Sequence, residues 1–176
     1  PEDFGVLSMV VIYTGFVTIL SQSGITPVVV QKQDINDDDL STVFWLSSFI
    51  SLILFLFTVL IAPIIESFFV YSGLSEVIQL MSITLLFVGM AAVPDGRLKR
   101  KLRFLEIAVV DIVSAIISGA IAICLALQDY GYWALVMQNV SMQFFRLTGL
   151  FLLNKWLPKL IFQSWVLRKI FSYSGF

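Results

Sequence analysis

Five long apolar stretches, separated by short polar segments, constrain the fold of this 176-residue chain more than any other feature. They cover residues 4–30, 42–65, 74–93, 104–127 and 130–153. A helix needs about 20 largely apolar residues to cross the hydrocarbon core of a bilayer, which is roughly 30 Å thick. The apolar residues run continuously rather than alternating with a period of two, so helices are favoured over a membrane barrel. We therefore predict five transmembrane helices and the amphipathic start of a further helix from about residue 157.

The polar segments between the stretches are too short to fold on their own. The sequence thus predicts an all-α, multi-pass membrane helix bundle in which residues 1–176 form a single transmembrane domain. The chain starts at Pro1 and stops inside an apolar stretch at Phe176, which is typical of a fragment of a longer protein.

Composition narrows the possible functions. Hydrophobic residues make up 59% of the chain and charged residues 13%, whereas soluble domains carry about 45–50% and about 25%. A water-soluble enzyme, a nucleic-acid binder and a disordered tail are therefore excluded, and the net charge of −1 attracts no polyanion. Histidine is absent, and Cys124 is the single cysteine, so the usual general base and thiolate metal clusters are missing. We expect no catalytic residue, no metal and no cofactor.

The basic residues indicate the orientation of the chain. Ten of the eleven lysines and arginines lie in alternate polar segments, on one predicted side of the membrane. They are Lys32; Arg97, Lys99, Arg100, Lys101 and Arg103; and Lys155, Lys159, Arg168 and Lys169. The positive-inside rule assigns that side to the cytoplasm.

Two charged residues lie inside predicted helices: Asp111 in the fourth stretch and Arg146 in the fifth. An ionised side chain in hydrocarbon costs at least about 2.5–3.5 kcal/mol, so neither should face lipid. Each lies seven residues from the cytoplasmic end of its stretch, which places both about 10 Å deep on consecutive antiparallel helices. Three arrangements stay open: a structural Asp111–Arg146 pair, a wet cavity lined by both groups, or an Arg146 side chain that reaches the cytoplasmic surface.

Other polar residues favour the cavity. Asn139, Gln143 and Arg146 follow one another at i, i+4 and i+7, which places them on one stripe of a helix. Ser114 and Ser118 extend the position of Asp111 in a similar way, although small residues on that face would equally suit close helix packing. A polar lumen and simple packing both remain possible. The candidate lumen or substrate contacts are Arg146, Asp111, Gln143 and Asn139.

Two charged runs lie between the stretches. The predicted cytoplasmic loop over residues 94–103 carries Arg97, Lys99, Arg100, Lys101 and Arg103. Such a run is typical of a topology signal that meets anionic lipid, and it could also gather a diphosphate-bearing lipid.

The acidic run over residues 34–39 begins like a calcium loop. It has Asp39 where that loop needs glycine and Trp45 where it needs glutamate, so we interpret Asp39 as the cap of a helix that begins near Ser41.

Four segments resemble motifs of the multidrug/oligosaccharidyl-lipid/polysaccharide flippase superfamily, in the order and spacing of its polysaccharide-biosynthesis branch. They are Pro1-Glu-Asp-Phe-Gly5; Asp39-Leu-Ser-Thr-Val-Phe-Trp45; Val93-Pro-Asp-Gly-Arg-Leu-Lys-Arg-Lys-Leu-Arg-Phe104; and Gly131-Tyr-Trp-Ala-Leu135. Members of this branch move lipid-linked O-antigen or exopolysaccharide units, and they have two lobes of helices around a central cavity.

The resemblance implies that the five stretches are helices two to six of such a protein. The chain would supply most of the amino-terminal lobe and would lack the first helix and the second lobe. By the same likeness, Arg146 is a lumen contact for an anionic substrate, and Asp111 is its partner or a cation-coupling group.

We therefore expect a non-enzymatic flippase of the bacterial inner membrane that moves an oligosaccharide on a polyprenyl diphosphate by alternating access. Expected partners are that substrate, membrane lipids, and a polysaccharide polymerase with its export machinery; no nucleic acid is expected. One rival is a cation-coupled multidrug or metabolite exporter of the same superfamily. Another is a membrane-embedded polymerase or ligase, disfavoured because the external segments carry no basic residue. A prenyltransferase is disfavoured because it needs a second acidic cluster and the other cytoplasmic segments are basic. The last rival is an assembly subunit of an export complex.

Overall fold

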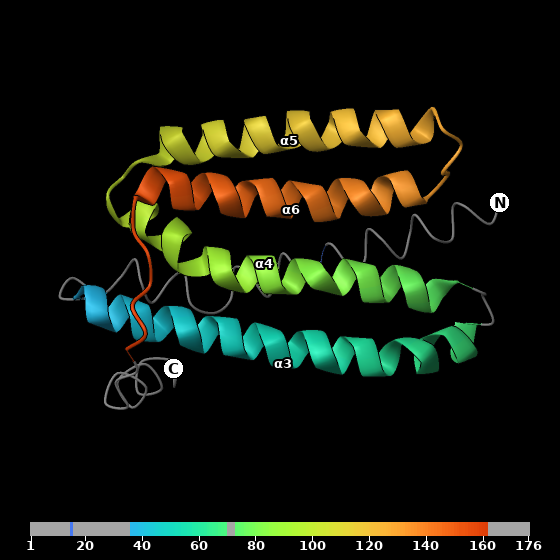
Figure 1. Ribbon diagram of the computed structural model, residues 1–176, viewed down its shortest axis with the longest axis horizontal. Coiled ribbons are helices and arrows are strands. Elements are labelled where there is room, and N and C mark those ends of the chain that lie inside the picture. The colour runs from blue at the N-terminus through green and yellow to red at the C-terminus, as the bar shows by residue number, and fades with distance from the viewer. Residues whose placement is uncertain (1–14, 16–35, 70–72, 162–176) are drawn as a thin grey trace.

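A computed structural model describes Gly15 and residues 36–69 and 73–161 of the chain (Figure 1). Within these ranges the chain forms four helices and no strand. The helices are α3 (Asp37–Phe69), α4 (Leu74–Arg100), α5 (Phe104–Ala126) and α6 (Trp133–Asn154). The predicted all-α helix bundle is confirmed. The first predicted span, residues 4–30, lies outside the described residues except for Gly15, which is helical.

The four helices lie side by side in the order α3, α4, α6, α5 (Figure 1). Helix α4 packs between α3 and α6, whereas α5 packs on α6 and meets α4 only marginally. Helices α3 and α4 run antiparallel, as do α5 and α6, whereas the two inner helices α4 and α6 run parallel (Figure 1). The starts of α3 and α5 therefore lie at the end of the bundle where α4 and α6 finish. We call this the basic end, because the lysines and arginines of residues 97–103 lie there.

Three of these helices are long and apolar enough to cross a membrane: α3, α4 and α5. Half of the most apolar window of α4 is buried inside the protein, against 11% for α3 and 22% for α5, which fits the inner position of α4. The outer face of α3 exposes a row of large apolar side chains. They include Phe49, Ile53, Phe57, Leu60 and Phe68. Soluble proteins rarely expose so long an apolar patch, so this face is suited to lipid and the chain is a membrane protein.

Close approach between helices depends on two glycines. A Cβ atom at Gly89 of α4 would lie 2.5 Å from the Cβ of Ser51 on α3, and one at Gly149 of α6 would lie 2.8 Å from a methyl of Val110 on α5. Such contacts are shorter than real Cβ atoms allow. The two interfaces therefore use small residues. Membrane helices commonly do so, because lipid is as apolar as the helices and their association depends on close packing.

Helix α4 does not end at Val93, as the apolar stretch predicted, but continues through Pro94 to Arg100. A proline inside a helix removes one backbone donor and crowds the carbonyl four residues earlier, so α4 needs support from outside at this turn. Pro94 is buried among neighbouring helices, which hold the turn in place. Asn154 of α6 donates a hydrogen bond from Nδ2 to the carbonyl oxygen of Pro94 at 2.8 Å. The basic residues of the last turn also favour the helix, because cations stabilise the C-terminal end of the helix dipole. Residues 94–100 are therefore helix rather than loop.

Helix α3 begins at Asp37, earlier than the predicted start near Ser41. Three acidic residues occupy its first turn, where the helix dipole favours negative charge. Asp39 does not cap a helix that starts at Ser41. Its Oδ2 instead accepts a hydrogen bond from the backbone N–H of Asn36 at 3.4 Å, in the manner of a capping box.

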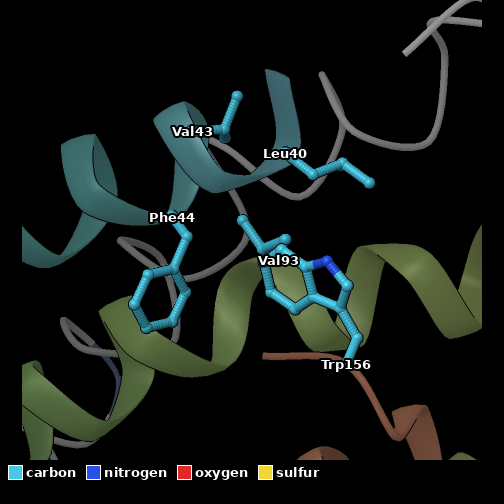
Figure 2. Packing of buried hydrophobic residues seen from close by; sticks show 5 residues of the cluster. All are labelled: Leu40, Val43, Phe44, Val93 and Trp156. Carbon is cyan, nitrogen blue, oxygen red and sulfur yellow. The ribbon is translucent and has the colours of Figure 1, made fainter. Parts of the chain in front are cut away.

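A non-helical strap over residues 155–161 follows α6 and crosses to the start of α3 (Figure 1). Lys155 has a left-handed backbone with φ of 48°, which ends α6, and the helix predicted from Leu157 does not begin within residues 157–161. Residues 162–176 lie outside the described ranges. Trp156 anchors the strap in an apolar cluster with side chains of α3 and α4 (Figure 2). The other buried members are Leu40, Val43, Phe44 and Val93.

Candidate functional site

Four charged side chains meet near the basic end and join three helices. Asp95 and Lys99 come from α4, Asp111 from α5 and Arg146 from α6. We call them the charge cluster. Arg146 is the shared member, because its Nε lies 2.8 Å from Asp111 Oδ1 and its Nη2 lies 3.1 Å from Asp95 Oδ1. Lys99 completes the cluster, with its Nζ 2.6 Å from Asp95 Oδ2.

Helix register brings these groups to one level. Asp111 lies seven residues after the start of α5, and Arg146 lies eight residues before the end of α6. At 1.5 Å per residue both are about 10–12 Å inside their helices. Asp95 lies five residues before the end of α4, and its carboxylate meets Lys99 one turn later along the same helix. The continuation of α4 past Pro94 is therefore what carries Asp95 into the cluster.

The cluster is electrically balanced but unevenly buried. Two carboxylates face two cations, so the four formal charges cancel. The side chain of Asp95 is 7% exposed, that of Arg146 is 24% exposed and that of Asp111 is 43% exposed. A buried carboxylate is tolerated only when partners satisfy it, and both oxygens of Asp95 have a cationic partner. The cluster is closed on the side of Asp95 and open on the side of Asp111.

Two of the four candidate lumen residues predicted from sequence come together in the structure, and two stay apart. Arg146 and Asp111 form the pair described above. Asn139 donates from its side chain to the backbone carbonyl of Leu135 at 3.0 Å, which is an interaction within α6. Gln143 lies one turn before Arg146, and no hydrogen bond among the described residues joins it to the cluster.

The polar stripe of α6 does not lie on the exposed side of that helix. At 100° per residue, Asn139, Gln143 and Arg146 fall on one side, and all three are half-buried. The exposed positions of α6 fall on the opposite side: Met137, Phe144, Thr148 and Leu152. The polar stripe therefore faces the inside of the bundle, as a polar interior requires. That this interior serves as a lumen stays a prediction.

The serine stripe of α5 serves packing. Ser114 and Ser118 are 2% and 0% exposed, and the hydroxyl of Ser118 donates to the backbone carbonyl of Ala115 at 3.2 Å. A side chain that is fully buried and bonded to its own helix does not line an open space. Of the two interpretations of this face, close packing is the one that the structure favours.

The basic run predicted as a free loop is largely engaged with carboxylates. Arg97 pairs with Asp37 of α3 at 2.7 Å, Lys99 belongs to the charge cluster, and Arg103 pairs with Glu106 of α5. Arg100 also has a partner within the protein. Lys101 is exposed at the C-cap of α4. The run therefore ties the basic end together, and its prediction as a loop over residues 94–103 is wrong except for the short turn after Arg100.

Sequence reasoning missed Asp95 because the apolar stretch stops at Val93. One signal could have found it. Asp95 and Lys99 have the i, i+4 spacing that pairs opposite charges on a helix. A helix extended by two turns would have placed a second carboxylate near the depth of Arg146.

The strap forms a second ionic region at the start of α3. Lys159 pairs with Asp38 at 2.8 Å, and Trp45 donates from Nε1 to the backbone carbonyl of Lys159 at 2.9 Å. The guanidinium of Arg97 lies 4.9 Å from the ring centre of Trp156, in a cation–π contact. The hydrogen bond from Lys159 to Asp38 raises the pKa of Lys159 above its usual 10.5. The acidic run thus holds the strap, in place of the free solvated loop expected for it.

The chemistry available at the charge cluster is ion exchange. Among the described residues no group of three or more histidine, cysteine and acidic side chains is placed to hold a metal ion. A guanidinium that already holds two carboxylates can trade one of them for another anion, because its five donors suit carboxylate and phosphate oxygens alike.

Comparison with known proteins gives one family over the whole chain. The pattern of the family described as "Polysaccharide biosynthesis protein" matches residues 1–176. No solved structure matches the chain.

Three curated proteins are similar in sequence. The succinoglycan biosynthesis transport protein ExoT of Rhizobium meliloti (strain 1021) is 24% identical over 176 residues, which is all of this chain and 35% of ExoT. The teichuronic acid biosynthesis protein TuaB of Bacillus subtilis (strain 168) is 25% identical over 93% of the chain and 34% of its own length. An uncharacterized membrane protein in the cps region of Klebsiella pneumoniae is 33% identical over 58% of the chain and 20% of its own length. The chain spans about a third or less of the length of these relatives.

Proposed function

The chain belongs to the family of polysaccharide biosynthesis proteins, and from this premise we propose that it forms most of one lobe of a lipid-linked oligosaccharide flippase. The cargo is a polysaccharide repeat unit on a polyprenyl diphosphate, and it crosses the bacterial inner membrane by alternating access. ExoT, which is similar to this chain over its whole length, is named a transport protein, and this supports transport as the role of this part of the sequence. The proposal includes a polysaccharide polymerase and export machinery as partners of the full-length protein.

The charge cluster carries this proposal. Charged side chains inside membrane helices are costly, and a buried ion pair can often be replaced by apolar residues without loss of stability. The cluster places four charges between α4, α5 and α6, of which α4 and α5 are long and apolar enough to cross a membrane, and this indicates a use beyond holding the helices together. Transport of a diphosphate with hydrophilic sugars supplies such a use, because this headgroup needs a polar path beside the lipid tail.

Arg146 is the residue that we propose meets the diphosphate. Its guanidinium is a quarter exposed, it lies on the side of α6 away from the exposed apolar residues, and it carries donors that suit phosphate oxygens. Gln143 and Asn139 continue the same stripe and would contact the sugars. No covalent step is involved, and a chain without histidine lacks the usual general base for one.

A cation-coupled exporter is the second candidate, because two carboxylates converge in the same cluster. Asp111 is half-exposed and could bind a proton or a sodium ion. Asp95 is less suited, since Arg146 and Lys99 already occupy both of its oxygens. The two candidates differ in which residue is essential: Arg146 for an anionic cargo, Asp111 for a coupled cation.

The test replaces Arg146 with alanine in the full-length protein and measures surface polysaccharide in cells that depend on it. We expect Arg146→Ala to abolish surface polysaccharide and to leave lipid-linked repeat units at the cytoplasmic side, while the protein remains in the membrane. Lys101→Ala is the matched control, because it removes one exposed positive charge at the same end and leaves the cluster intact. Normal polysaccharide in Arg146→Ala would refute the assignment. Loss of transport in Asp111→Asn with Arg146→Ala unaffected would favour the exporter.

A further inference from the structure

The two carboxylates that hold Arg146 are not equivalent. Asp95 is 7% exposed and has a cation on each oxygen: Arg146 Nη2 at 3.1 Å and Lys99 Nζ at 2.6 Å. Asp111 is 43% exposed, and its hydrogen bond in the structure is the one that it accepts from Arg146 Nε at 2.8 Å. The same guanidinium therefore has one fixed counter-ion and one counter-ion at the open side of the cluster.

The free-energy cost of breaking the ion pair with Arg146 therefore differs between the two carboxylates. If Asp95 moved away, Lys99 would lose its partner and a carboxylate in a closed site would lose two charge-assisted hydrogen bonds. If Asp111 moved away, its carboxylate would turn toward the side where it is already exposed, and no second cation would lose a partner. Arg146 would meanwhile stay in place, because Asp95 still holds its Nη2.

The guanidinium also has capacity that the present pairing does not use. Nε and Nη2 bind two different carboxylates, so neither carboxylate forms the bidentate pair that arginine makes with planar oxyanions. An anion with several oxygens and more than one negative charge could take the place of Asp111 and contact the guanidinium more strongly. A diphosphate has this chemistry, whereas a singly charged phosphodiester offers less charge to offset the release of Asp111.

We propose that Asp111 is a place-holder: it occupies the anion site of Arg146 in the empty protein and is displaced by the diphosphate group of the cargo. This inference rests on the proposed function for its choice of ligand, and it adds Asp111 as the residue that sets the affinity of the site for the diphosphate. The place-holder keeps Arg146 neutralised while the site is empty, and it weakens binding enough for the cargo to leave again.

The test measures binding of inorganic pyrophosphate to purified full-length protein by isothermal titration calorimetry at constant ionic strength. We expect Asp111→Asn to bind pyrophosphate about tenfold more tightly than the unmodified protein, the factor that corresponds to one competing charged hydrogen bond removed. Asp129→Asn is the matched control. It removes one negative charge from an exposed turn at the far end of α5, where asparagine tolerates the positive φ of 60°. Arg146→Lys in the Asp111→Asn background should reverse the gain.

The outcomes separate this inference from the proposed function. Unchanged or weaker pyrophosphate binding in Asp111→Asn, relative to Asp129→Asn, would overturn the place-holder. The absence of binding in both the unmodified protein and Asp111→Asn would overturn it as well. A tenfold gain in Asp111→Asn, together with normal surface polysaccharide in Arg146→Ala, would keep the place-holder and reject the flippase. Liposomes with phosphatidylglycerol form a second arm: if they compete with pyrophosphate at equal phosphorus, the site binds bulk lipid headgroups and the diphosphate assignment fails.

Discussion

The charge cluster and the strap both join α4 to its neighbours through aspartate and a basic residue, yet they are built differently. Beside the strap, Arg97 of α4 pairs with Asp37 of α3 and also lies over the ring of Trp156. Trp156 belongs to the strap and is itself buried in an apolar cluster. In the charge cluster, the hydrogen bonds of Arg146 go only to carboxylates. Apolar burial is therefore the main stabilising term in the strap, and the ion pairs are secondary. In the cluster the charges stabilise one another, so the loss of Asp95 or of Arg146 leaves another charge of the cluster without its partner.

The most damaging change should be the removal of the fixed carboxylate, Asp95→Ala. It leaves Arg146 and Lys99 without their shared partner, and breaking a buried pair in this way costs about 3–5 kcal/mol. The free energy of unfolding, measured by titration with a denaturing detergent, checks this. Asp129→Asn at the exposed turn after α5, where asparagine tolerates the positive φ of 60°, serves as the control. A loss of stability no larger than that of the control would mean that the cluster is not held by its charges.

Trp156→Ala should come next and tests the strap. The ring is 8% exposed and packs against four buried side chains of α3 and α4, so its removal should cost about 3 kcal/mol. Leu157→Ala, at a neighbouring position that is 79% exposed, should change stability little. If Trp156→Ala proved as mild as Leu157→Ala, apolar burial would not be what holds the strap, and the contrast between the two regions would disappear.

A smaller effect is expected for Asp111→Asn. The carboxylate is 43% exposed and holds one cation where Asp95 holds two, so its pair with Arg146 should contribute less to stability, about 1 kcal/mol. The same detergent titration, run beside Asp95→Asn, compares the open and the closed side of the cluster. Equal losses in the two variants would show that both carboxylates are structural, and would count against a replaceable Asp111.

The smallest effect belongs to Lys159. The raised pKa of Lys159 means that its pairing with Asp38 contributes fully below the unfolded pKa of 10.5 and is lost as pH rises through the higher folded value. The strap should therefore be insensitive to pH from 6 to 9 and should loosen only in strong alkali. The fluorescence of Trp156, in a variant whose other three tryptophans are phenylalanine, reports this. Lys159→Met should remove the alkaline transition and should give, already at neutral pH, the spectrum that the unmodified protein shows in strong alkali, because both lack the positive charge that pairs with Asp38.

The sequence predicted the parts of this structure that depend on local pattern. The fourth apolar stretch, residues 104–127, matches α5 at Phe104–Ala126, because polar turns flank it on both sides. The equal depth of Asp111 and Arg146 followed from counting residues along two adjacent helices, and the structure joins the two side chains. Both inferences need only the helical rise and the position of the polar turns.

The remaining features depend on contacts that no local pattern records. The apolar stretch stops at Val93, whereas burial between α3 and α6 keeps α4 helical through Pro94 and places Asp95 in the cluster. The strap is fixed by Lys159 and Asp38, which lie 121 residues apart. An amphipathic pattern after α6 could not distinguish a new helix from an extended segment whose apolar ring reaches a distant helix.

One consequence follows from the central place of α4. Asp95 and Arg97 are two residues apart on this helix, so their side chains point about 200° away from each other: one toward α6, the other toward α3 and Trp156. A rigid helix cannot turn one of them without turning the other. A movement that rotates α4 at the charge cluster must therefore also disturb the contacts of Arg97 with Asp37 and Trp156, so the cluster and the strap are mechanically coupled through this helix.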